Sequence, residues 1–483
     1  MNNLQNTPKN NSQKVVLISP PDEDYIKVID EEFIVIDPPL GLAYIAAVLQ
    51  KNHIDVSIID ANASQYSIDT VVEDVIKRCP EFVGISVFTF LIETCCEIAQ
   101  KIKVALPETK IIFGGPHIHT QYEEVLRLYS FVDFCVRGEG EYAVLELVNT
   151  IKENGDLEKV KGISYRSNGK IINNSEREFI KNLDELPFPA RELLPFDKYR
   201  GPQSIGGKKH FTTILPSRGC PFDCHYCACH AIWGNQRRRS VENVLEEIEY
   251  AHTHFGITTM RFEDDLFTVN KKWAMGICEG MIKRGLNKKI TWETNGRVNT
   301  LSKDLLIAMK NANCRSIAIG IEFGNQKILD FANKGIKIPQ IIETVKLIKS
   351  CRLRVKAYFM IGYPTETKET IEDTIRFSQS LDIDYVIFSL VTPFPGTPLY
   401  DYVVKNNLIT STNWADYRFG KARTIKLEGI SEDELMQLWY RASDEFWYRP
   451  RQMVKIFLWH PRYSTQIAIK TIIKNIKNFF RKA

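Results

Sequence analysis

The chain has 483 residues, 44% hydrophobic and 25% charged, so it can bury a large core, and its length suggests two or three domains. The net charge of +4 is small, and no apolar run reaches the roughly 18 residues that a membrane-spanning helix needs. The polar N-terminus MNNLQNTPKNNSQK lacks the apolar stretch of a signal peptide, so we expect a cytoplasmic protein.

The positive charge is concentrated at the C-terminus. From Arg451 to Ala483 eight residues are basic and none is acidic, so residues 1–450 carry 55 basic against 59 acidic residues. This mildly acidic body argues against a nucleic-acid-binding enzyme. The tail pattern fits either an amphipathic helix on an anionic membrane or a terminal helix docked on the protein itself. Its apolar residues at helical spacing are Ile469, Ile472, Ile473, Ile476 and Phe480.

The first 150 residues alternate strands and helices. Strands are expected at 14–21, 55–61, 82–88 and 110–117, a helix at 40–52, and a last strand and helix opening at 131–141. This alternation predicts a doubly wound, flavodoxin-like parallel sheet, which binds ligands at the carboxyl ends of its strands. Those ends carry Ser86 to Thr89, Gly114-Gly115-Pro116-His117 and the GEGE run at 138–141, although glycines are also ordinary turn residues. No GxGxxG follows the first strand, which argues against a dinucleotide site.

Residues 151–205 have the pattern of a connection between domains. GISYRSNGKIINN at 162–174 predicts a hairpin that turns at Asn168-Gly169. The following segment, 183–199, is punctuated by prolines in the manner of a linker.

Six further βα units predict a partial (β/α)6 TIM-type barrel over 206–410. The expected strands are 211–217, 258–264, 290–296, 316–323, 354–362 and 385–393. Eight units would close a full barrel, so six indicate an open one. A small helical region, 411–483, follows, with a helix at 433–457 that ends or bends near Pro450 and has an aromatic face expected to pack on the barrel. That face contains Trp439, Tyr440, Phe446, Trp447 and Tyr448.

Four cysteines are crowded into CPFDCHYCACH, residues 220–230, directly after the first barrel strand. Thiolates spaced CxxxCxxC, here Cys220, Cys224 and Cys227, can hold three corners of an iron–sulfur cube and leave one iron open. Zinc would call for a second, separate CxxC pair, which the sequence lacks. The scattered cysteines are expected to be small core residues; they are Cys79, Cys95, Cys96, Cys135, Cys278, Cys314 and Cys351.

RGCPFDCHYC at 218–227 resembles the signature of the radical S-adenosylmethionine (SAM) superfamily. The resemblance implies a 4Fe-4S cluster on Cys220, Cys224 and Cys227, with SAM on the open iron, and cleavage of SAM to a 5′-deoxyadenosyl radical. It gives Cys229 no ligand role, so a structural one is expected, and it makes Tyr226 a candidate contact of the SAM adenine. His225 is expected to be an exposed loop residue.

Later barrel segments also resemble the superfamily. FEDDLFT at 262–268 makes Glu263, Asp264 and Asp265 candidates for the SAM amino group, since carboxylates complement an ammonium. GIEFG at 320–324 resembles a GIESG segment whose glutamate, here Glu322, faces the SAM ribose. FMIGYPTET at 359–367 and TPFPGTPLY at 392–400 resemble the segment beside the adenine and the loop that closes the sixth unit.

PPLGLAYIAAVL, GGPH and DFCVRGEGE ahead of such a barrel resemble the cobalamin-binding subclass of the superfamily, so that the resemblance spans about residues 14–410. It implies a corrinoid between the sheet's strand ends and the barrel, with a cradle formed by Ser86, Thr89, Gly114, Gly115 and Gly138. The DxHxxG motif that supplies a histidine to cobalt in many cobalamin proteins is absent. His117 is expected to touch the corrin periphery or solvent, and the lower cobalt ligand stays unassigned.

The function that these resemblances imply is a cobalamin-dependent radical SAM methyltransferase acting at an unactivated carbon of a small molecule or lipid. A low-potential donor such as flavodoxin or ferredoxin would supply electrons, and no nucleic acid is expected. The alternatives are an oxidative cyclase or ring-rearranging enzyme without methyl transfer, and a corrinoid-binding sensor or carrier with an inert barrel. No catalytic residue beyond the cofactor ligands is assigned.

Overall fold

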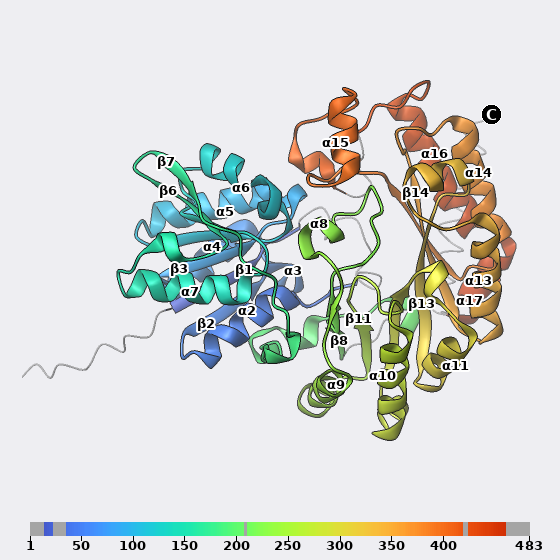
Figure 1. The fold of residues 1–483 in the computed structure, drawn as a ribbon, viewed down its shortest axis with the longest axis horizontal. Coiled ribbons are helices and arrows are strands. Elements are labelled where there is room, and N and C mark those ends of the chain that lie inside the picture. Colours follow the sequence, from blue (N-terminus) through green and yellow to red (C-terminus); the bar gives the residue numbers. More distant parts are fainter. Residues whose placement is uncertain (1–13, 23–34, 207–209, 419–423, 460–483) are drawn as a thin grey trace, which may run out of the picture.

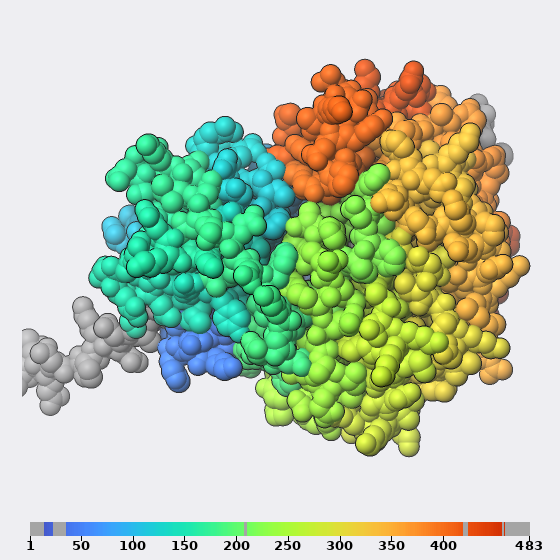
Figure 2. All heavy atoms as spheres, viewed as in Figure 1, coloured from blue at the N-terminus to red at the C-terminus, as the bar shows by residue number. Residues whose placement is uncertain are grey.

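The computed structural model describes residues 14–22, 35–206, 210–418 and 424–459, and these form two α/β units joined by a folded connection (Figure 1). The N-terminal unit, blue to teal, lies against the C-terminal unit, green to orange, in the space-filling view (Figure 2). Within these residues no helix is both long and apolar enough to cross a membrane.

The N-terminal unit is the expected doubly wound sheet. Its strands are β1 (Lys14–Ser19), β2 (Asp55–Asp60), β3 (Phe82–Ser86), β4 (Lys110–Gly114) and β5 (Phe134–Val136), all parallel in the order β2-β1-β3-β4-β5. Alternate residues of β1 face opposite cores: Val15 and Leu17 join one cluster, and Val16 and Ile18 join the other. The first cluster includes residues of α2 (Leu40–Lys51) and α7 (Gly140–Lys152), and the second includes residues of α4 (Ile68–Arg78), α5 (Ile92–Ala105) and α6 (Pro116–Leu128).

The predicted hairpin forms, but it belongs to the N-terminal sheet rather than to a free connection. Strands β6 (Ile163–Ser167) and β7 (Lys170–Asn173) extend the sheet antiparallel beyond β5. Asn168 and Gly169 at the turn have φ of 49° and 74°, the left-handed conformations that a two-residue hairpin turn of this kind requires.

The C-terminal unit is an open six-stranded barrel, as the βα alternation predicts. The parallel strands follow in sequence order, so β8 and β15 are edges. They are β8 (Phe211–Ile214), β11 (Thr259–Phe262), β12 (Thr291–Gly296), β13 (Cys314–Glu322), β14 (Arg354–Ile361) and β15 (Tyr385–Leu390). The covering helices are α9 (Val241–Phe255), α10 (Lys271–Lys283), α11 (Lys303–Asn311), α13 (Ile338–Ser350), α14 (Lys368–Ser380) and α15 (Pro398–Lys405).

Two helices end the described chain, α16 (Glu432–Trp447) and α17 (Pro450–Trp459), with the predicted break before Pro450. The aromatic face of α16 packs only in part. Phe446 is fully buried and the Trp439 indole donates to the Phe388 carbonyl at 2.8 Å, but Tyr440 is 58% exposed. The predicted tail helix lies outside the described residues.

The expectation that the scattered cysteines are core residues holds for five of the seven. Cys95, Cys96, Cys135, Cys278 and Cys314 are buried. It is wrong for Cys79, which is exposed, and for Cys351, which is half-buried. Both follow the last turn of a helix, α4 and α13, where the chain turns away from the core.

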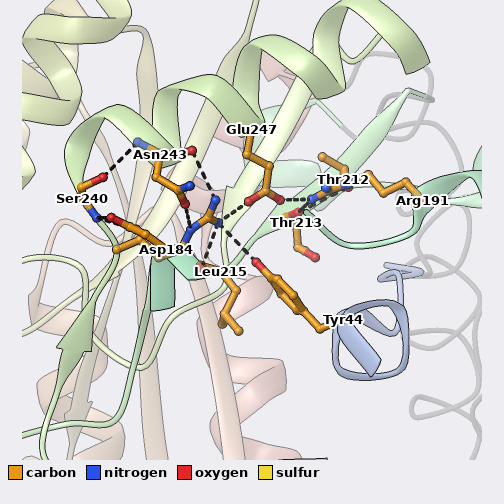
Figure 3. A network of polar contacts seen from close by, with 10 residues as sticks. Tyr44, Asp184, Arg191, Thr212, Thr213, Leu215, Ser240, Asn243 and Glu247 are labelled. Carbon is orange, nitrogen blue, oxygen red and sulfur yellow. Dashed lines mark hydrogen bonds and ion pairs between the residues drawn. The ribbon is translucent and has the colours of Figure 1, made fainter. Parts of the chain in front are cut away.

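A buried network of charges holds the two units together (Figure 3). Glu247 on α9 is fully buried and pairs with Arg191 of the connection at 2.6 Å and also with Arg239. Arg239 is buried as well, and its guanidinium donates to the hydroxyl of Tyr44 on α2 at 3.2 Å. The proline-punctuated connection is therefore a packed part of the interface, with Tyr199 fully buried in the N-terminal core.

We expect Glu247→Gln to lower the free energy of unfolding by about 3–5 kcal/mol, because it leaves two buried guanidinium groups without their carboxylate. Denaturant unfolding of the purified chain measures the change. The matched control is Glu146→Gln. Glu146 pairs with Arg177 but its side chain is 43% exposed, so this substitution should lower the free energy of unfolding by less than about 1 kcal/mol. Equal losses in the two variants would contradict the role of Glu247.

Candidate functional site

The cysteine loop starts at the carboxyl end of the first barrel strand and lies between the two units. After β8 the short strand β9 (Ser217–Arg218) pairs antiparallel with β10 (Arg237–Arg238), which closes the base of the loop. Gly219 sits in this neck at φ +88°, where a Cβ would lie 2.6 Å from the Gly234 carbonyl oxygen, so only glycine fits. The loop continues into α8 (Cys229–Trp233), which faces the N-terminal unit (Figure 1).

The base of the loop is tied to the N-terminal unit by buried ion pairs. Arg218 donates to Glu139 at 2.7 Å and to Glu141 at 2.6 Å, and Arg237 reaches Glu139 at 3.0 Å. The two glutamates are 5% and 3% exposed. The GEGE run therefore joins the two units through its glutamates, a role that the sequence did not reveal.

The three predicted cluster ligands occupy different surroundings. Cys224 is buried, Cys220 is half-buried and Cys227 is exposed. A hydrogen bond from Cys229 lowers the pKa of Cys220 to about 6, and the same thiol lowers the pKa of Cys227. Cys229 itself has a raised pKa because its thiol is held by both neighbours. The structure thus brings Cys220, Cys227 and Cys229 together.

In the described part of the chain, no three His, Cys, Asp or Glu side chains converge on one point as the ligands of a single metal ion would. In a 4Fe-4S cube each thiolate binds a different iron, so three cysteine ligands need not surround one centre. The donor set of three cysteines on one tight loop fits a 4Fe-4S cluster with an open iron.

A second loop, residues 332–335 after α12 (Gln326–Phe331), braces the cysteine loop from the barrel side. The Ala332 carbonyl accepts the backbone N–H of His225 at 3.1 Å, and the Asn333 amide donates to the Asp223 carbonyl at 2.6 Å. His225 is half-buried, so its expected exposure is wrong: its backbone is held on both sides, since its carbonyl accepts from Leu399.

Lys334 is a site residue that the sequence analysis missed. Its ammonium donates to Glu322 at 2.7 Å and to the Tyr226 hydroxyl at 3.0 Å, and the lysine is only 6% exposed. The backbone around Glu322 is adapted to this pair. Glu322 has φ +68°, and a Cβ at Gly320 would collide with the Glu322 carboxylate. Burial, together with the nearby Glu322 charge, raises the pKa of Tyr226 well above its usual value.

The three successive carboxylates after β11 have three separate environments. Glu263 is exposed and pairs with Arg261, which also binds Asp37 at 2.8 Å. Asp264 is 3% exposed and accepts from Ser217 at 2.7 Å, and burial raises its pKa to about 8. Asp265 is exposed and accepts the backbone N–H of Gly219 at 2.9 Å, so Asp264 and Asp265 both contact the neck of the cysteine loop, but only Asp265 is exposed there.

The glycines of the predicted corrin cradle differ in the space around them. Gly138 has φ +74° and open space where a Cβ would be, and Gly114 has only ordinary contacts there. Gly115 has φ +97°, and a Cβ would lie 2.9 Å from the Val87 nitrogen and 3.3 Å from the Ser86 hydroxyl. The strand ends at Gly138 and Gly114 thus offer backbone that a large ligand can approach, which fits a corrin.

His117 and Thr89 are buried, so of the two environments expected for His117, solvent is wrong and contact with the corrin periphery stays a prediction. The imidazole is 2% exposed, lies 3.3 Å from the Thr89 hydroxyl and packs edge-on against Trp414, with ring centroids 5.4 Å apart. Burial lowers the pKa of His117 to about 4. The cause is the segment after the barrel, η9 (Trp414–Tyr417), which packs back onto the N-terminal unit.

Two family models match the chain in the order of its two units. The model of the B12 binding domain matches residues 26–148, and that of the radical SAM superfamily matches residues 214–378. The chain is 36% identical over 462 residues to an uncharacterized methyltransferase of Pyrococcus horikoshii, covering 95% of this chain and 98% of that protein.

Two further proteins are less similar to this chain in sequence. The anaerobic magnesium-protoporphyrin IX monomethyl ester cyclase of Cereibacter sphaeroides is 29% identical over 405 residues, which are 83% of this chain and 65% of that protein. The solved structure of the radical SAM methyltransferase TsrM from Kitasatospora setae, with cobalamin and a [4Fe-4S] cluster bound, matches with a TM-score of 0.70 at 16% identity. That match covers 91% of this chain and 90% of TsrM, and it shows a shared fold.

We expect Lys334→Met to destabilise the chain by about 3–5 kcal/mol, because Glu322 would be left buried without its cation. The double variant Lys334→Met/Glu322→Gln should recover most of this loss, since no unpaired charge remains. Denaturant unfolding of these two variants and of the single variant Glu322→Gln gives the coupling energy. Lys337→Met is the control, because Lys337 is 60% exposed in its pair with Asp330 and should cost less than about 1 kcal/mol. A double variant as unstable as the single one would contradict the pairing.

Proposed function

The chain belongs to the radical SAM superfamily and carries a B12-binding domain, and from this membership we propose that it is a cobalamin-dependent methyltransferase acting at an unactivated carbon of a small molecule. The relative that is 36% identical across nearly the whole chain is named a methyltransferase, which supports methyl transfer. The observation that carries the proposal is the position of the cysteine loop between the two units, where one substrate would meet both cofactors.

We assign the cluster to Cys220, Cys224 and Cys227. When bound, the cluster supplies the electron that cleaves SAM to methionine and a 5′-deoxyadenosyl radical, with a low-potential flavodoxin or ferredoxin as the electron source. The chain's part is to hold three thiolates on a loop braced from both sides, so that the geometry is fixed before the cofactors bind. Cys229 supports Cys220 and Cys227 through its thiol.

The SAM contacts divide among three barrel segments. Asp265 is the carboxylate suited to the SAM ammonium, because it is exposed beside the loop neck, whereas Asp264 is buried and Glu263 is paired with Arg261. Glu322 would accept from the ribose and Tyr226 would pack on the adenine, with the Lys334 ammonium fixing the orientation of both. Lys334 is in this sense a positioning residue.

The corrin would rest on the strand ends of the N-terminal unit. Ser86, Gly114, Gly115 and Gly138 line these ends, and the open space at Gly138 supports a close approach there. Thr89 would contribute by holding His117, because its buried hydroxyl lies 3.3 Å from the Nδ1 atom of that imidazole. The N-terminal unit, which lies beside the barrel, would also help to exclude water and oxygen from the radical.

A cyclase is the second candidate, since the Cereibacter sphaeroides enzyme is 29% identical over most of this chain. The cluster and SAM residues named above serve both reactions equally. The two differ in their products, because methyl transfer consumes a second SAM and releases S-adenosylhomocysteine, whereas cyclisation does not.

We expect the protein reconstituted anaerobically with iron, sulfide and cobalamin to form both 5′-deoxyadenosine and S-adenosylhomocysteine from SAM when a low-potential reductant is added. Deoxyadenosine without S-adenosylhomocysteine would favour cyclisation. Cys220→Ala, Cys224→Ala and Cys227→Ala should each lose bound iron and deoxyadenosine formation, and Cys229→Ala should retain the iron. Deoxyadenosine formation by Cys227→Ala would overturn the ligand assignment.

We also propose that the basic C-terminal tail contacts an anionic membrane. Helix α17 supports this, because Val454 and Leu458, four residues apart, are 59% and 69% exposed as the chain enters the tail. Docking of α17 on the barrel opposes membrane contact by this helix. Lys455 pairs with Asp382 at 2.7 Å and with Asp384 at 2.8 Å. A substrate dissolved in the bilayer would suit such a contact.

Liposome co-sedimentation tests this contact. The full chain should pellet with anionic vesicles and not with neutral ones, and the bound fraction should fall as salt rises, because the attraction is between opposite charges. A chain that ends after Trp459 keeps α17 and its ion pairs and serves as the matched control. Equal pelleting of the two chains would contradict the role of the tail.

A further inference from the structure

Arg297 is a buried cation whose partner is a predicted cluster ligand. It directly follows β12, at the carboxyl end of the third barrel strand, and is 6% exposed. Its guanidinium donates to the sulfur of Cys224 at 3.3 Å and to the side-chain oxygen of Asn299 at 3.1 Å, and it also donates to the Lys334 carbonyl. It stacks on the ring of Phe222, 3.9 Å from the ring centroid.

The other buried arginines are neutralised by carboxylates. Arg191 and Arg239 share Glu247, and Arg218 pairs with Glu139 and Glu141. Among the described residues no ion pair with a carboxylate is formed by Arg297. A buried guanidinium needs an anion nearby, and here the candidate is the Cys224 sulfur, which is a thiolate when it binds iron.

Such a contact affects the energy of an electron on the cluster. Adding one electron increases the negative charge shared by the irons and their sulfur ligands, and a cation that donates N–H···S stabilises the more negative state most. Hydrogen bonds to sulfur, net charge and burial are among the factors that set iron–sulfur reduction potentials. The guanidinium is held in place by Asn299, Lys334 and Phe222, so its charge stays at the sulfur.

We propose that Arg297 is a positioning residue that raises the reduction potential of the cluster through its N–H···S bond to Cys224. The step concerned is the transfer of one electron from a low-potential flavodoxin- or ferredoxin-class donor to the oxidised cluster, with no bond made or broken in the protein. Without Arg297, the donor would reduce a smaller fraction of the protein. The inference rests on the cluster part of the proposed function and is independent of methyl transfer.

The test is a redox titration of the reconstituted full chain, without SAM or substrate, followed by the electron paramagnetic resonance signal of the reduced cluster. We expect Arg297→Gln to be about tenfold harder to reduce, a shift of about 59 mV to more negative potential for one electron. Arg297→Lys should shift less in the same direction, because it keeps the charge and loses the planar fork. Bound iron and sulfide are measured for each variant so that only loaded protein is compared.

Arg238→Gln is the matched control. Arg238 lies on β10 close to the neck of the cysteine loop, but it is exposed and donates to Gln236, so removing its charge should leave the potential unchanged.

A wild-type potential in loaded Arg297→Gln, or a shift to more positive potential, would overturn the proposal. Should Arg297→Gln fail to hold the cluster, the Arg297→Lys titration decides, and a potential equal to that of the wild type overturns the proposal. If Arg297→Gln shows the expected negative shift but the wild-type protein forms no S-adenosylhomocysteine in the SAM assay, this inference stands and methyl transfer is contradicted.

Discussion

The arrangement of the site depends on buried ion pairs between the base of the cysteine loop and the N-terminal unit. Arg218 stands two residues before the first cluster cysteine, and Arg237 lies on the returning strand, and both meet Glu139. A buried charge pair resists separation, because each member would be left unpaired in a low-dielectric interior. The cysteine loop, which would hold the cluster, and the strand ends, which would hold the corrin, are therefore fixed relative to one another by the protein itself.

Buried charges with close partners also fix the opposite side of the cysteine loop. Lys334 and Arg297 bring two positive charges to the buried side of the cysteine loop, where Lys334 is met by Glu322 and Arg297 by the Cys224 sulfur. The main chain links the two, since Arg297 donates to the Lys334 carbonyl. Lys334, which holds the proposed SAM residues Glu322 and Tyr226, and Arg297, which contacts the proposed cluster ligand Cys224, are thus joined directly.

Much of this architecture could be predicted from the sequence. Apolar strands alternating with helices gave both sheets and their carboxyl-terminal edges, because periodicity and connection length are local properties. The candidate ligand cysteines could be proposed from the sequence because the CxxxCxxC motif is local too. Lys334 and Arg297 could not, since Tyr226 lies 108 positions from Lys334 and Cys224 lies 73 positions from Arg297, and no short motif encodes these contacts or the pairing of Lys334 with Glu322, 12 positions away. For the same reason the burial of His117 was missed: Trp414, which covers it, is distant in sequence.

The GEGE run has a structural role that its sequence did not indicate. Its glycines lie at a strand end, and Gly138 leaves the open space that a ligand at such an end requires. Its glutamates point into the interface and neutralise the loop arginines. One short segment therefore both borders the proposed corrin space and fixes the cysteine loop, so a substitution at Glu139 or Glu141 would disturb the cysteine loop through its ion pairs. Such positions are identified by their ion pairs and burial rather than by a motif.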